Sequence, residues 1–430
     1  MSRPPFGVNL FGYVSGNFGL AVAARNTLEM LMGAGTPLVV HDTKLYDGRS
    51  GHHNEYGHLY ASRSDPMPYG VNLFHLNPDD VLNRIPLQWI RVPVETRFNV
   101  IVPFWELPTI PDIWREGLGM MDLVLAPTHY IKEIIEAAVP EATVLHFPQA
   151  VHLPAGITPN RARWGLVDAA VVFLSGFDVL SDMGRKNPWG AIEAFRLAFP
   201  ADESVRLLIK LNNADVNSEY APLVWELREK AAADPRIRII DERLPYAEVL
   251  SLYASCDAFV SLHRAEGLGL ILMEMMSLGK PIITTAWSGN MDFSTAENSC
   301  LVGYDMVPVS ASHAAYRDEA GSHASVRWAD PHLDEAAEWM RKLAGNVELR
   351  ERLGSRARAD MATRLAEHNN AAIVDELRHR YEEFDVASVP HTPRATAIRV
   401  WRRSQAVRRM VRVPRAAVLI AGRKLGLYKG

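Results

Sequence analysis

Two carboxylates, Glu266 and Glu274, lie eight residues apart in the segment EGLGLILMEMMSLG, among glycines and large apolar side chains. Gly267 and Gly269, on either side of Leu268, would let backbone N–H groups approach a ligand at the start of a helix, which is a favourable place for a phosphate. Glu274 follows about two helical turns later, so it can share a broad face with the loop. The structural alternative is that Glu266 caps the helix and Glu274 is an exposed helix position.

A basic pair, Arg185 and Lys186, follows a predicted strand in the segment SGFDVLSDMGRKNPWGAIEAF, with no acidic residue adjacent to it in sequence. Arginine can hold two phosphate oxygens at once, and lysine acts as a point charge, so the pair could neutralise a diphosphate. Lys210, near the end of VRLLIKLN, could also reach a nucleotide. The alternatives are a surface loop that opens a helix and a solvated strand end.

The segment GYVSGNFGLA places Gly12, Gly16 and Gly19 between a predicted strand and a predicted helix. This spacing departs from the G-x-G-x-x-G fingerprint of dinucleotide-binding proteins, so it is weak support for such a site. Ser15, Gly16 and Asn17 are candidates for contact with a donor phosphate or an acceptor.

The segment FWELP directly follows the apolar run NVIVP. Glu106, at the end of this predicted strand, is placed for a polar role that we assign to the acceptor. For Trp105 two interpretations stay open, an acceptor contact and an aromatic cluster below the strand end. Charged residues at strand termini are common places for ligand contact in α/β proteins.

Other chemistries have little support in the sequence. The chain has no Asp-x-Asp and no G-x-S-x-G segment, which argues against metal-dependent GT-A glycosyltransferases and serine hydrolases. His52, His53 and His58 lie in a polar loop without a nearby set of cysteines or carboxylates, so we expect no metal there. The two cysteines, Cys256 and Cys300, stand in apolar surroundings and are interpreted as buried free thiols of a reducing compartment.

The elements that must position these residues alternate between short apolar strands and longer helix-permissive stretches, an α/β pattern with parallel sheets. The first third reads as a strand–helix series from VNLFGYV to TVLHFPQAV. A Pro- and Gly-containing stretch follows near residues 150–165, and the pattern restarts at AAVVFLSGF and continues to PIITTAW. Beyond residue 330 the chain is strongly helical. Two doubly wound halves joined by a linker fit these restarts better than one large sheet.

The segment from Glu266 to Glu274 resembles the Glu-x7-Glu signature of retaining glycosyltransferases of family 4, which have the GT-B fold. The resemblance continues through MMSLGKPII and the donor-loop-like TTAWSGNMD, and FWEL is similar to a segment of bacterial members. Phe177-Asp178 stands where the family commonly has an arginine, and His129 stands where it commonly has Ser or Thr.

The resemblance implies a role for each candidate. The catalytic candidates are Glu266, Arg185 and Lys186; the donor-binding candidates are Glu274, Gly267, Leu268, Gly269, Lys210 and Gly16; the acceptor-side candidates are Asn17 and Glu106. Glu266 would lie by the donor sugar and Glu274 would bind the ribose hydroxyls. No metal or other cofactor is expected.

The implied architecture has two Rossmann-like domains that face a cleft, with a helical extension. The expected parts are an acceptor-side domain 1–150, a linker 151–168, a nucleotide-sugar domain 169–354, a crossover helix 355–385 and a basic tail 386–430. The implied reaction moves a sugar, with retention, from a nucleotide diphosphate sugar to a glycan or lipid-linked acceptor in bacterial envelope polysaccharide synthesis. Alternatives are a nucleotide-sugar epimerase, a sugar phosphorylase, a non-catalytic sugar-binding protein and, less favoured, a nicotinamide-dependent oxidoreductase.

The charge distribution is uneven. Residues 391–430 contain eleven Arg or Lys and no acidic residue, which leaves 35 basic and 50 acidic residues before them, a net charge of −15. Apolar residues recur every three or four positions in this tail, as in an amphipathic helix at a membrane surface; a solvated appendage is the alternative. An acidic body without a recognition module argues against nucleic acid. The sequence predicts a cytoplasmic protein with peripheral contact to the inner face of the membrane as an open alternative.

Overall fold

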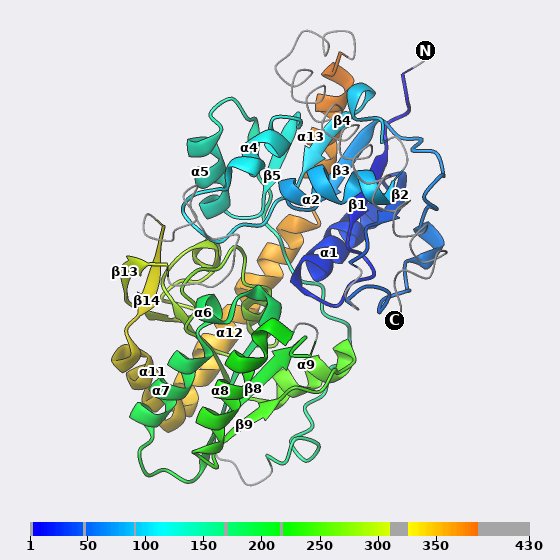
Figure 1. The fold of residues 1–430 in the computed structure, drawn as a ribbon. Coiled ribbons are helices and arrows are strands. Elements are labelled where there is room, and N and C mark those ends of the chain that lie inside the picture. Colours follow the sequence, from blue (N-terminus) through cyan, green and yellow to red (C-terminus); the bar gives the residue numbers. More distant parts are fainter. Residues whose placement is uncertain are drawn as a thin grey trace, which may run out of the picture.

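The computed structural model describes residues 3–45, 49–89, 92–166, 171–215, 218–309 and 326–385. In this part of the chain two six-stranded parallel sheets form two α/β halves, one above the other in Figure 1. The predicted fold class, two Rossmann-like doubly wound domains with C-terminal helices, is confirmed. The basic tail and the predictions made for it lie outside the described residues.

The first sheet has the strand order β2-β1-β3-β4-β5-β6. Its strands are β1 Val8–Gly12, β2 Leu38–Asp42, β3 Val71–His75, β4 Phe98–Ile101, β5 Leu123–Ala126 and β6 Val144–His146. Helices α1 Gly19–Gly33, α2 Pro78–Asn83, α3 Ile85–Gln88, α4 Asp112–Leu118 and α5 His129–Ala138 lie between these strands, with short 3-10 turns η1 Gly57–Leu59 and η2 Val94–Thr96. Helices cover both faces of a parallel sheet, which is why its central strands read as continuous apolar runs.

Three asparagines break these apolar runs at one level of the sheet. Asn9 on β1 is in register with Asn72 on β3, and Asn72 with Asn99 on β4. Their side chains form a buried ladder, in which Asn9 Nδ2 donates to Asn72 Oδ1 at 3.0 Å and Asn72 Nδ2 donates to Asn99 Oδ1 at 2.9 Å. Because a slipped strand would leave these buried amides without partners, the ladder specifies the register of the three strands.

The second sheet has the strand order β12-β11-β10-β7-β8-β9. Its strands are β7 Val171–Asp178, β8 Val205–Asn212, β9 Ile237–Ile240, β10 Ala258–Ser261, β11 Ile282–Thr285 and β12 Cys300–Val302. Its helices are α6 Met183–Lys186, α7 Pro188–Ala198, α8 Ala221–Ala232, α9 Tyr246–Ser255 and α10 Leu270–Ser277, with turns η3 Val179–Ser181, η4 Ser218–Tyr220 and η5 Gly289–Asp292. The sequence analysis did not predict β12 or the antiparallel pair β13 Tyr304–Pro308 and β14 Arg327–Pro331.

Three C-terminal helices, α11 Leu333–Gly345, α12 Val347–His368 and α13 Ala372–Glu383, complete the described fold. Helix α12 runs from the second half to the first (Figure 1), where Arg364 Nε donates to the Gln149 carbonyl at 2.7 Å. Helix α13 lies against the first half, and the Tyr381 hydroxyl donates to the Pro4 carbonyl at 2.6 Å. The last helices therefore hold the two halves together. Among the described residues no helix is long and apolar enough to cross a membrane.

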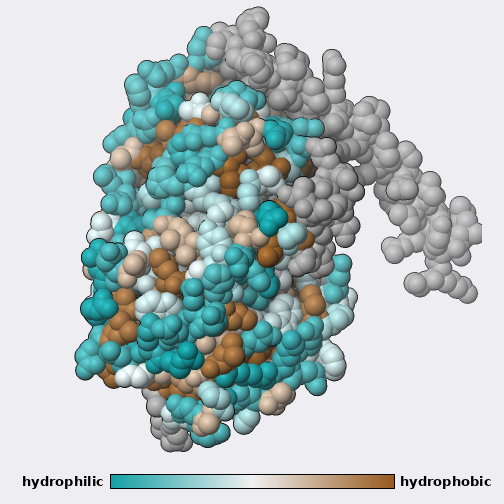
Figure 2. All heavy atoms as spheres, turned by 90° about the vertical axis from the view of Figure 1, so that its left-hand side faces the viewer, coloured by the Kyte–Doolittle hydropathy of each residue, from teal (hydrophilic) through white to brown (hydrophobic). Residues whose placement is uncertain are grey.

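The side of the molecule that carries α4, α5, β13 and α11 is mostly hydrophilic, and its hydrophobic side chains form small separate groups (Figure 2). The apolar faces of these helices point inward: α5 buries Ile131, Ile134 and Ile135. One hydrophobic cluster includes Phe104 of the first half and Leu268 of the second. The two halves therefore share packed surface beside the region where their strand ends meet.

Candidate active site

The loop after β10 carries Glu266 at the carboxyl end of a parallel strand, the edge at which open α/β sheets bind ligands. Helix α10 begins after Gly269, which has a φ of 97° and provides no side-chain cap. The alternative that Glu266 caps this helix is therefore wrong. The Glu266 N–H instead donates to Ser288 Oγ at 2.8 Å, and its carbonyl accepts from the Gly289 N–H at 2.8 Å. These bonds hold the Glu266 loop against the turn after β11.

Gly267 lies at the boundary of the two domains. A Cβ atom at this position would lie 2.7 Å from the carbonyl oxygen of Trp105 in the other half. The Gly267 carbonyl in turn accepts a hydrogen bond from Thr128 Oγ1 at 3.3 Å. The absence of a side chain here lets two backbones meet across the interface, in addition to any approach to a ligand.

Arg185 and Lys186 converge on Glu266. Lys186 Nζ pairs with Glu266 Oε2, and Arg185 Nη1 lies 3.7 Å from the same oxygen. Arg185 Nη2 lies 3.3 Å from Glu106 Oε1, and Nη1 donates to the Ala265 carbonyl at 2.9 Å. No acidic residue is adjacent to these cations in sequence, but folding brings carboxylates from distant loops to them. The result is a cluster of two cations and two carboxylates at the junction of the domains.

The backbone around α6 turns both cations inward. Asp182 and Asn187, on either side of this short helix, have φ values of 67° and 50°. Each side chain accepts a hydrogen bond from the next helix start, Asp182 from Arg185 N and Asn187 from Gly190 N. Left-handed backbone is tolerated by Asp and Asn because their short polar side chains bond locally. These two caps explain why a four-residue helix can present its last two residues to the site.

The charge on Glu266 is stabilised by its partners. Burial alone would raise the pKa of this carboxyl, but Lys186 and Arg185 outweigh burial and lower the pKa to about 2. The carboxylate is therefore ionised at all physiological pH values. A carboxylate held this firmly by two cations is a poor nucleophile and a poor base. Its geometry suits orientation and charge balance better than covalent catalysis.

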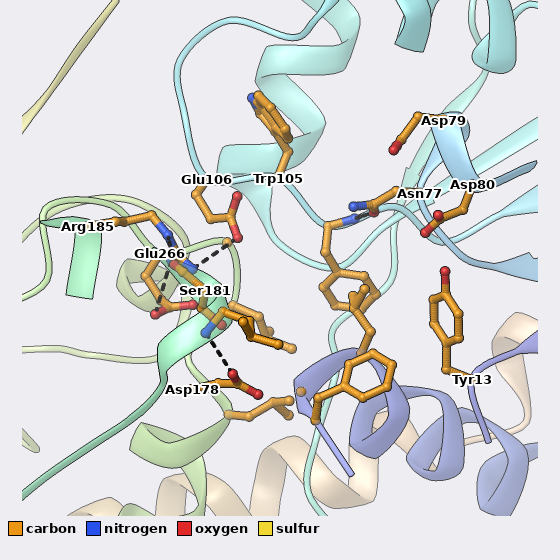
Figure 3. Close-up of a pocket in the computed structure, with 18 of the residues that line it drawn as sticks. Tyr13, Asn77, Asp79, Asp80, Trp105, Glu106, Asp178, Ser181, Arg185 and Glu266 are labelled. Carbon is orange, nitrogen blue, oxygen red and sulfur yellow. Dashed lines mark hydrogen bonds and ion pairs between the residues drawn. The ribbon is translucent and has the colours of Figure 1, made fainter. Parts of the chain in front are cut away.

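A cavity of about 680 Å³ opens beside this cluster, between the two domains. Six of the predicted site residues line it, namely Arg185, Glu266, Gly267, Leu268, Gly269 and Glu106. The ionic cluster forms one wall, and side chains of the first half form the opposite wall (Figure 3). The volume is in the range of pockets that bind small molecules.

The opposite wall contains residues that the sequence analysis missed. Asp79 accepts a hydrogen bond from Trp114 Nε1 at 3.1 Å, and Asp80 forms an ion pair with Arg84 at 2.5 Å. Burial, together with the neighbouring Asp80, raises the pKa of Asp79 to about 6. Tyr13 also lines this wall. The signal that could have identified them is NPDD directly after the strand GVNLFHL, because carboxylates at a strand end are placed for ligand contact.

Glu274 does not line the cavity. It is 4% exposed, and its Oε1 accepts a hydrogen bond from the Tyr246 hydroxyl at 2.7 Å. Burial raises the pKa of Glu274 to about 7, although Tyr246 and Arg25 oppose this shift. Arg25 donates to the carbonyls of Val14 and Gly16 at 2.9 Å each, in the first domain. The alternative that Glu274 is an exposed helix position is therefore wrong, since it is buried near the domain boundary.

The other predicted contacts also lie off the cavity wall. Lys210 is 5% exposed, and its Nζ donates to the Glu242 carbonyl at 3.0 Å, so the alternative of a solvated strand end is wrong. The Asn17 carbonyl accepts from Asn212 Nδ2 at 3.2 Å across the domain boundary. A Cβ at Gly16 would lie 2.5 Å from the ring of Phe18. These residues stabilise the loops around the cavity.

The two facing α/β domains define a fold class, as comparison with solved structures shows. The chain is similar to HepE (Alr3699) of Anabaena in complex with UDP and glucose, with a TM-score of 0.58 at 14% identity over 87% of this chain and 99% of that one. Sucrose-phosphate synthase of Thermosynechococcus elongatus has a TM-score of 0.59 at 14% identity, covering 88% and 100% of the two chains. Trehalose-6-phosphate synthase OtsA has a TM-score of 0.58 at 11% identity, covering 88% and 99%. These likenesses establish the GT-B fold.

Residues 185–316 match the family model described as glycosyl transferases group 1. This segment begins at Arg185 and includes Lys186, Glu266 and Glu274, so it contains both cations and one of the two carboxylates of the ionic cluster. The prediction that the chain is a glycosyltransferase is confirmed by this match. No curated protein sequence matches the chain significantly.

Proposed function

We propose that the protein transfers a sugar, with retention of anomeric configuration, from a nucleoside diphosphate sugar to a hydroxyl of a glycan or lipid-linked acceptor. The observation that carries this proposal is the cavity between the domains, with Arg185 and Glu266 on one wall and Asp79 and Asp80 on the other. The first wall belongs to the domain that matches the glycosyltransferase family. HepE binds UDP and glucose, which makes a UDP-sugar the first donor to test.

The wall formed by the ionic cluster suits a diphosphate leaving group. Arg185 and Lys186 would stabilise the negative charge that develops on the diphosphate as its bond to the sugar carbon breaks. In the free protein Glu266 balances this positive charge, and in the complex it would turn to the sugar hydroxyls. We propose that the diphosphate is neutralised by these side chains without a metal ion.

The ion pairs of the carboxylates favour attack by the acceptor hydroxyl on the same face of the sugar carbon from which the diphosphate departs. Glu266 is held by two cations and Glu106 lies 3.3 Å from Arg185, so neither is placed as a covalent nucleophile. In the proposed step the bond from the sugar carbon to the acceptor oxygen forms as the bond to the diphosphate oxygen breaks. The acceptor proton passes to the departing diphosphate, which carries away the electron pair.

The cavity wall formed by the first domain suits a compound with several hydroxyl groups. Asp79 and Asp80 can accept hydrogen bonds from hydroxyls, and Trp105 and Trp114, which pack on each other with ring centroids 4.9 Å apart, also line the cavity. Carboxylates beside aromatic faces suit a sugar ring, which has polar edges and apolar faces. We assign this wall to the acceptor because it belongs to the domain opposite the matched donor domain.

A thermal-shift panel with UDP, GDP, ADP, CMP and dTDP tests the nucleotide assignment. One nucleoside diphosphate is expected to stabilise the protein by about 2.7 kcal/mol at a hundred times its dissociation constant, because it binds only the folded state. Product analysis with the corresponding nucleotide sugar then separates the alternatives. Release of nucleoside diphosphate only with a sugar acceptor supports transfer, whereas an isomerised donor without acceptor, or dependence on inorganic phosphate, would show an epimerase or a phosphorylase. Binding without turnover would leave a sugar-binding protein.

The ribose assignment requires Glu274, which lies off the cavity wall, to exchange its hydrogen bond from Tyr246 for hydrogen bonds from the ribose hydroxyls, so nucleotide affinity is expected to depend on the ionisation of Glu274. Its pKa of about 7 leaves the carboxyl partly protonated in the free protein, and ribose hydroxyls bind the ionised form better. Affinity should therefore rise between pH 6 and pH 8, by up to about tenfold per unit below the pKa. Calorimetric titrations of the parent and of Glu274→Gln at several pH values isolate this dependence from ionisation of the phosphate itself. Parallel pH profiles of the two proteins would contradict the ribose assignment.

We further propose that the basic tail brings the protein to a membrane that holds a lipid-linked or envelope polysaccharide acceptor. The support is the sequence alone, with eleven basic residues among 391–430. Each basic residue near an anionic surface contributes about 1 kcal/mol of attraction. Co-sedimentation with anionic vesicles should therefore exceed that with neutral vesicles and fall with salt. A chain that ends at Val389 should lose this binding, and equal, salt-insensitive partitioning of both chains would reject the proposal.

A further inference from the structure

Three metal-ligating side chains meet outside the cavity, at the boundary of the two domains. Asp292, in η5 of the second domain, faces His129 at the start of α5 and His146 at the end of β6, both in the first domain. Asp292 Oδ2 lies 2.9 Å from His146 Nε2 and 3.2 Å from His129 Nδ1. The imidazole rings lie against each other with centroids 3.7 Å apart. Among the described residues this is the one group of three that could share a metal ion.

The geometry is close to that of a zinc site. In tetrahedral zinc sites with bonds of about 2.0–2.1 Å, neighbouring ligand atoms lie roughly 3.3–3.4 Å apart. The three ligand atoms here lie within 4.8 Å of one another, and two of the three separations are 2.9 and 3.2 Å. We propose that His129, His146 and Asp292 bind a divalent transition metal of the zinc class, with water in the fourth position. The His129 side chain is 63% exposed, so water and metal have access.

The environment of Asp292 supports a ligand role. Its side chain is 6% exposed, and both carboxylate oxygens lie 3.0 Å from the backbone N–H of His129. A donor of this kind orients a ligating carboxylate, as outer-shell partners do in known metal sites. Two imidazoles and one carboxylate form a donor set that zinc accepts, with one position left open.

A second cluster, of one histidine and two carboxylates, lacks the ligand arrangement of the proposed metal site and therefore serves as a comparison. His332 lies 3.1 Å from Glu335 through Nδ1 and 3.3 Å from Asp305 through Nε2. Its two carboxylates bind opposite edges of one ring, so they cannot share an ion with a single ring nitrogen. His332 therefore provides a matched control in the same chain.

The ion would connect the two domains. Asp292 ends a turn that begins at Gly289, whose N–H donates to the Glu266 carbonyl at 2.8 Å. Next to the histidines, Thr128 bonds to Gly267 across the same boundary. A metal held by both domains would fix this boundary and favour the arrangement in which the two halves are in contact. This role is separate from neutralisation of the diphosphate, because none of the three ligands lines the cavity. It departs from the sequence analysis, which expected no metal.

Titration of the full-length, untagged protein with Zn²⁺ in a calorimeter, and with Co²⁺ followed by its visible absorption, tests the site. We expect one equivalent to bind and Co²⁺ to give the intense d–d bands of a tetrahedral site. His146→Asn and Asp292→Asn should each weaken binding by at least about a hundredfold, more than loss of an outer-shell partner does. His332→Asn should bind as the parent does.

Small-angle scattering provides a second measurement that does not depend on catalysis. Zinc should reduce the radius of gyration of the parent, and of His332→Asn, but not of His146→Asn. Absence of saturable binding, or equal binding by His146→Asn and the parent, would overturn the proposal. Because binding is measured without nucleotide or acceptor, failure here leaves the proposed sugar transfer untouched.

Discussion

Replacement of Lys186 with methionine is expected to lower turnover by about 10²–10³-fold while the protein stays folded. Lys186 does not itself line the cavity, but it pairs with Glu266, which does, and the departing diphosphate would gain charge beside this pair. Loss of one group that stabilises developing charge typically costs about 2.7–4 kcal/mol of activation free energy. Methionine keeps most of the apolar stem, is one atom shorter, and removes the charged ammonium group. Single-turnover rates with a saturating donor would measure the effect on the chemical step.

Lys342→Met is the matched control, because Lys342 forms an exposed ion pair with Glu338 at 2.6 Å, far from the cavity in sequence and structure. Exposed pairs of this kind contribute little to stability. Turnover of Lys186→Met within threefold of the parent would remove Lys186 from the leaving-group site. The same assay with EDTA, run on His146→Asn so that the proposed interdomain metal is absent, tests neutralisation without a metal. Strong loss of activity there would contradict it.

The second large effect is expected for Glu266→Gln, which should separate binding from catalysis. The carboxylate competes with a diphosphate for Lys186 and Arg185, so its loss should leave nucleoside diphosphate affinity unchanged or higher. Turnover should fall by at least about a hundredfold, because the donor sugar loses the group that orients it. Isothermal titration with the nucleotide and steady-state kinetics measure the two quantities. A fall in affinity with unchanged turnover would contradict both assignments.

Glu266→Gln should also destabilise the free protein by about 3 kcal/mol, because it leaves buried cations without their main partner. Glu266 has a lowered pKa of about 2, so the stability it contributes is present above about pH 4.5 and is lost as the pH falls toward 2. Unfolding free energies of parent and variant should therefore converge on acidification. Saturating nucleoside diphosphate should restore more stability to the variant than to the parent. Glu338→Gln, at an exposed pair, should show none of these changes.

Much of the architecture was predictable because the signals for it are local. Alternating apolar runs and helical stretches predicted two parallel-sheet halves, and both are present. The elements that were missed have weak local signals: β12 is three residues long, and β13 and β14 depend on each other for pairing. A short edge strand is defined by the neighbour to which it bonds, which sequence periodicity does not report.

The residues of the candidate site also divide into features that the sequence predicted and features that only the structure showed. The sequence by itself determined that Glu266, its glycines, Arg185 and Lys186 lie at strand ends of one domain. Apolar strands and the glycines that mark turns are recognisable within short segments. Only the tertiary structure decided that both cations meet Glu266, about eighty residues away along the chain. It also decided that Glu274 is buried against Tyr246. Partners and burial depend on which loops pack together, and the free energy of a charge depends on those partners and on how much water they exclude.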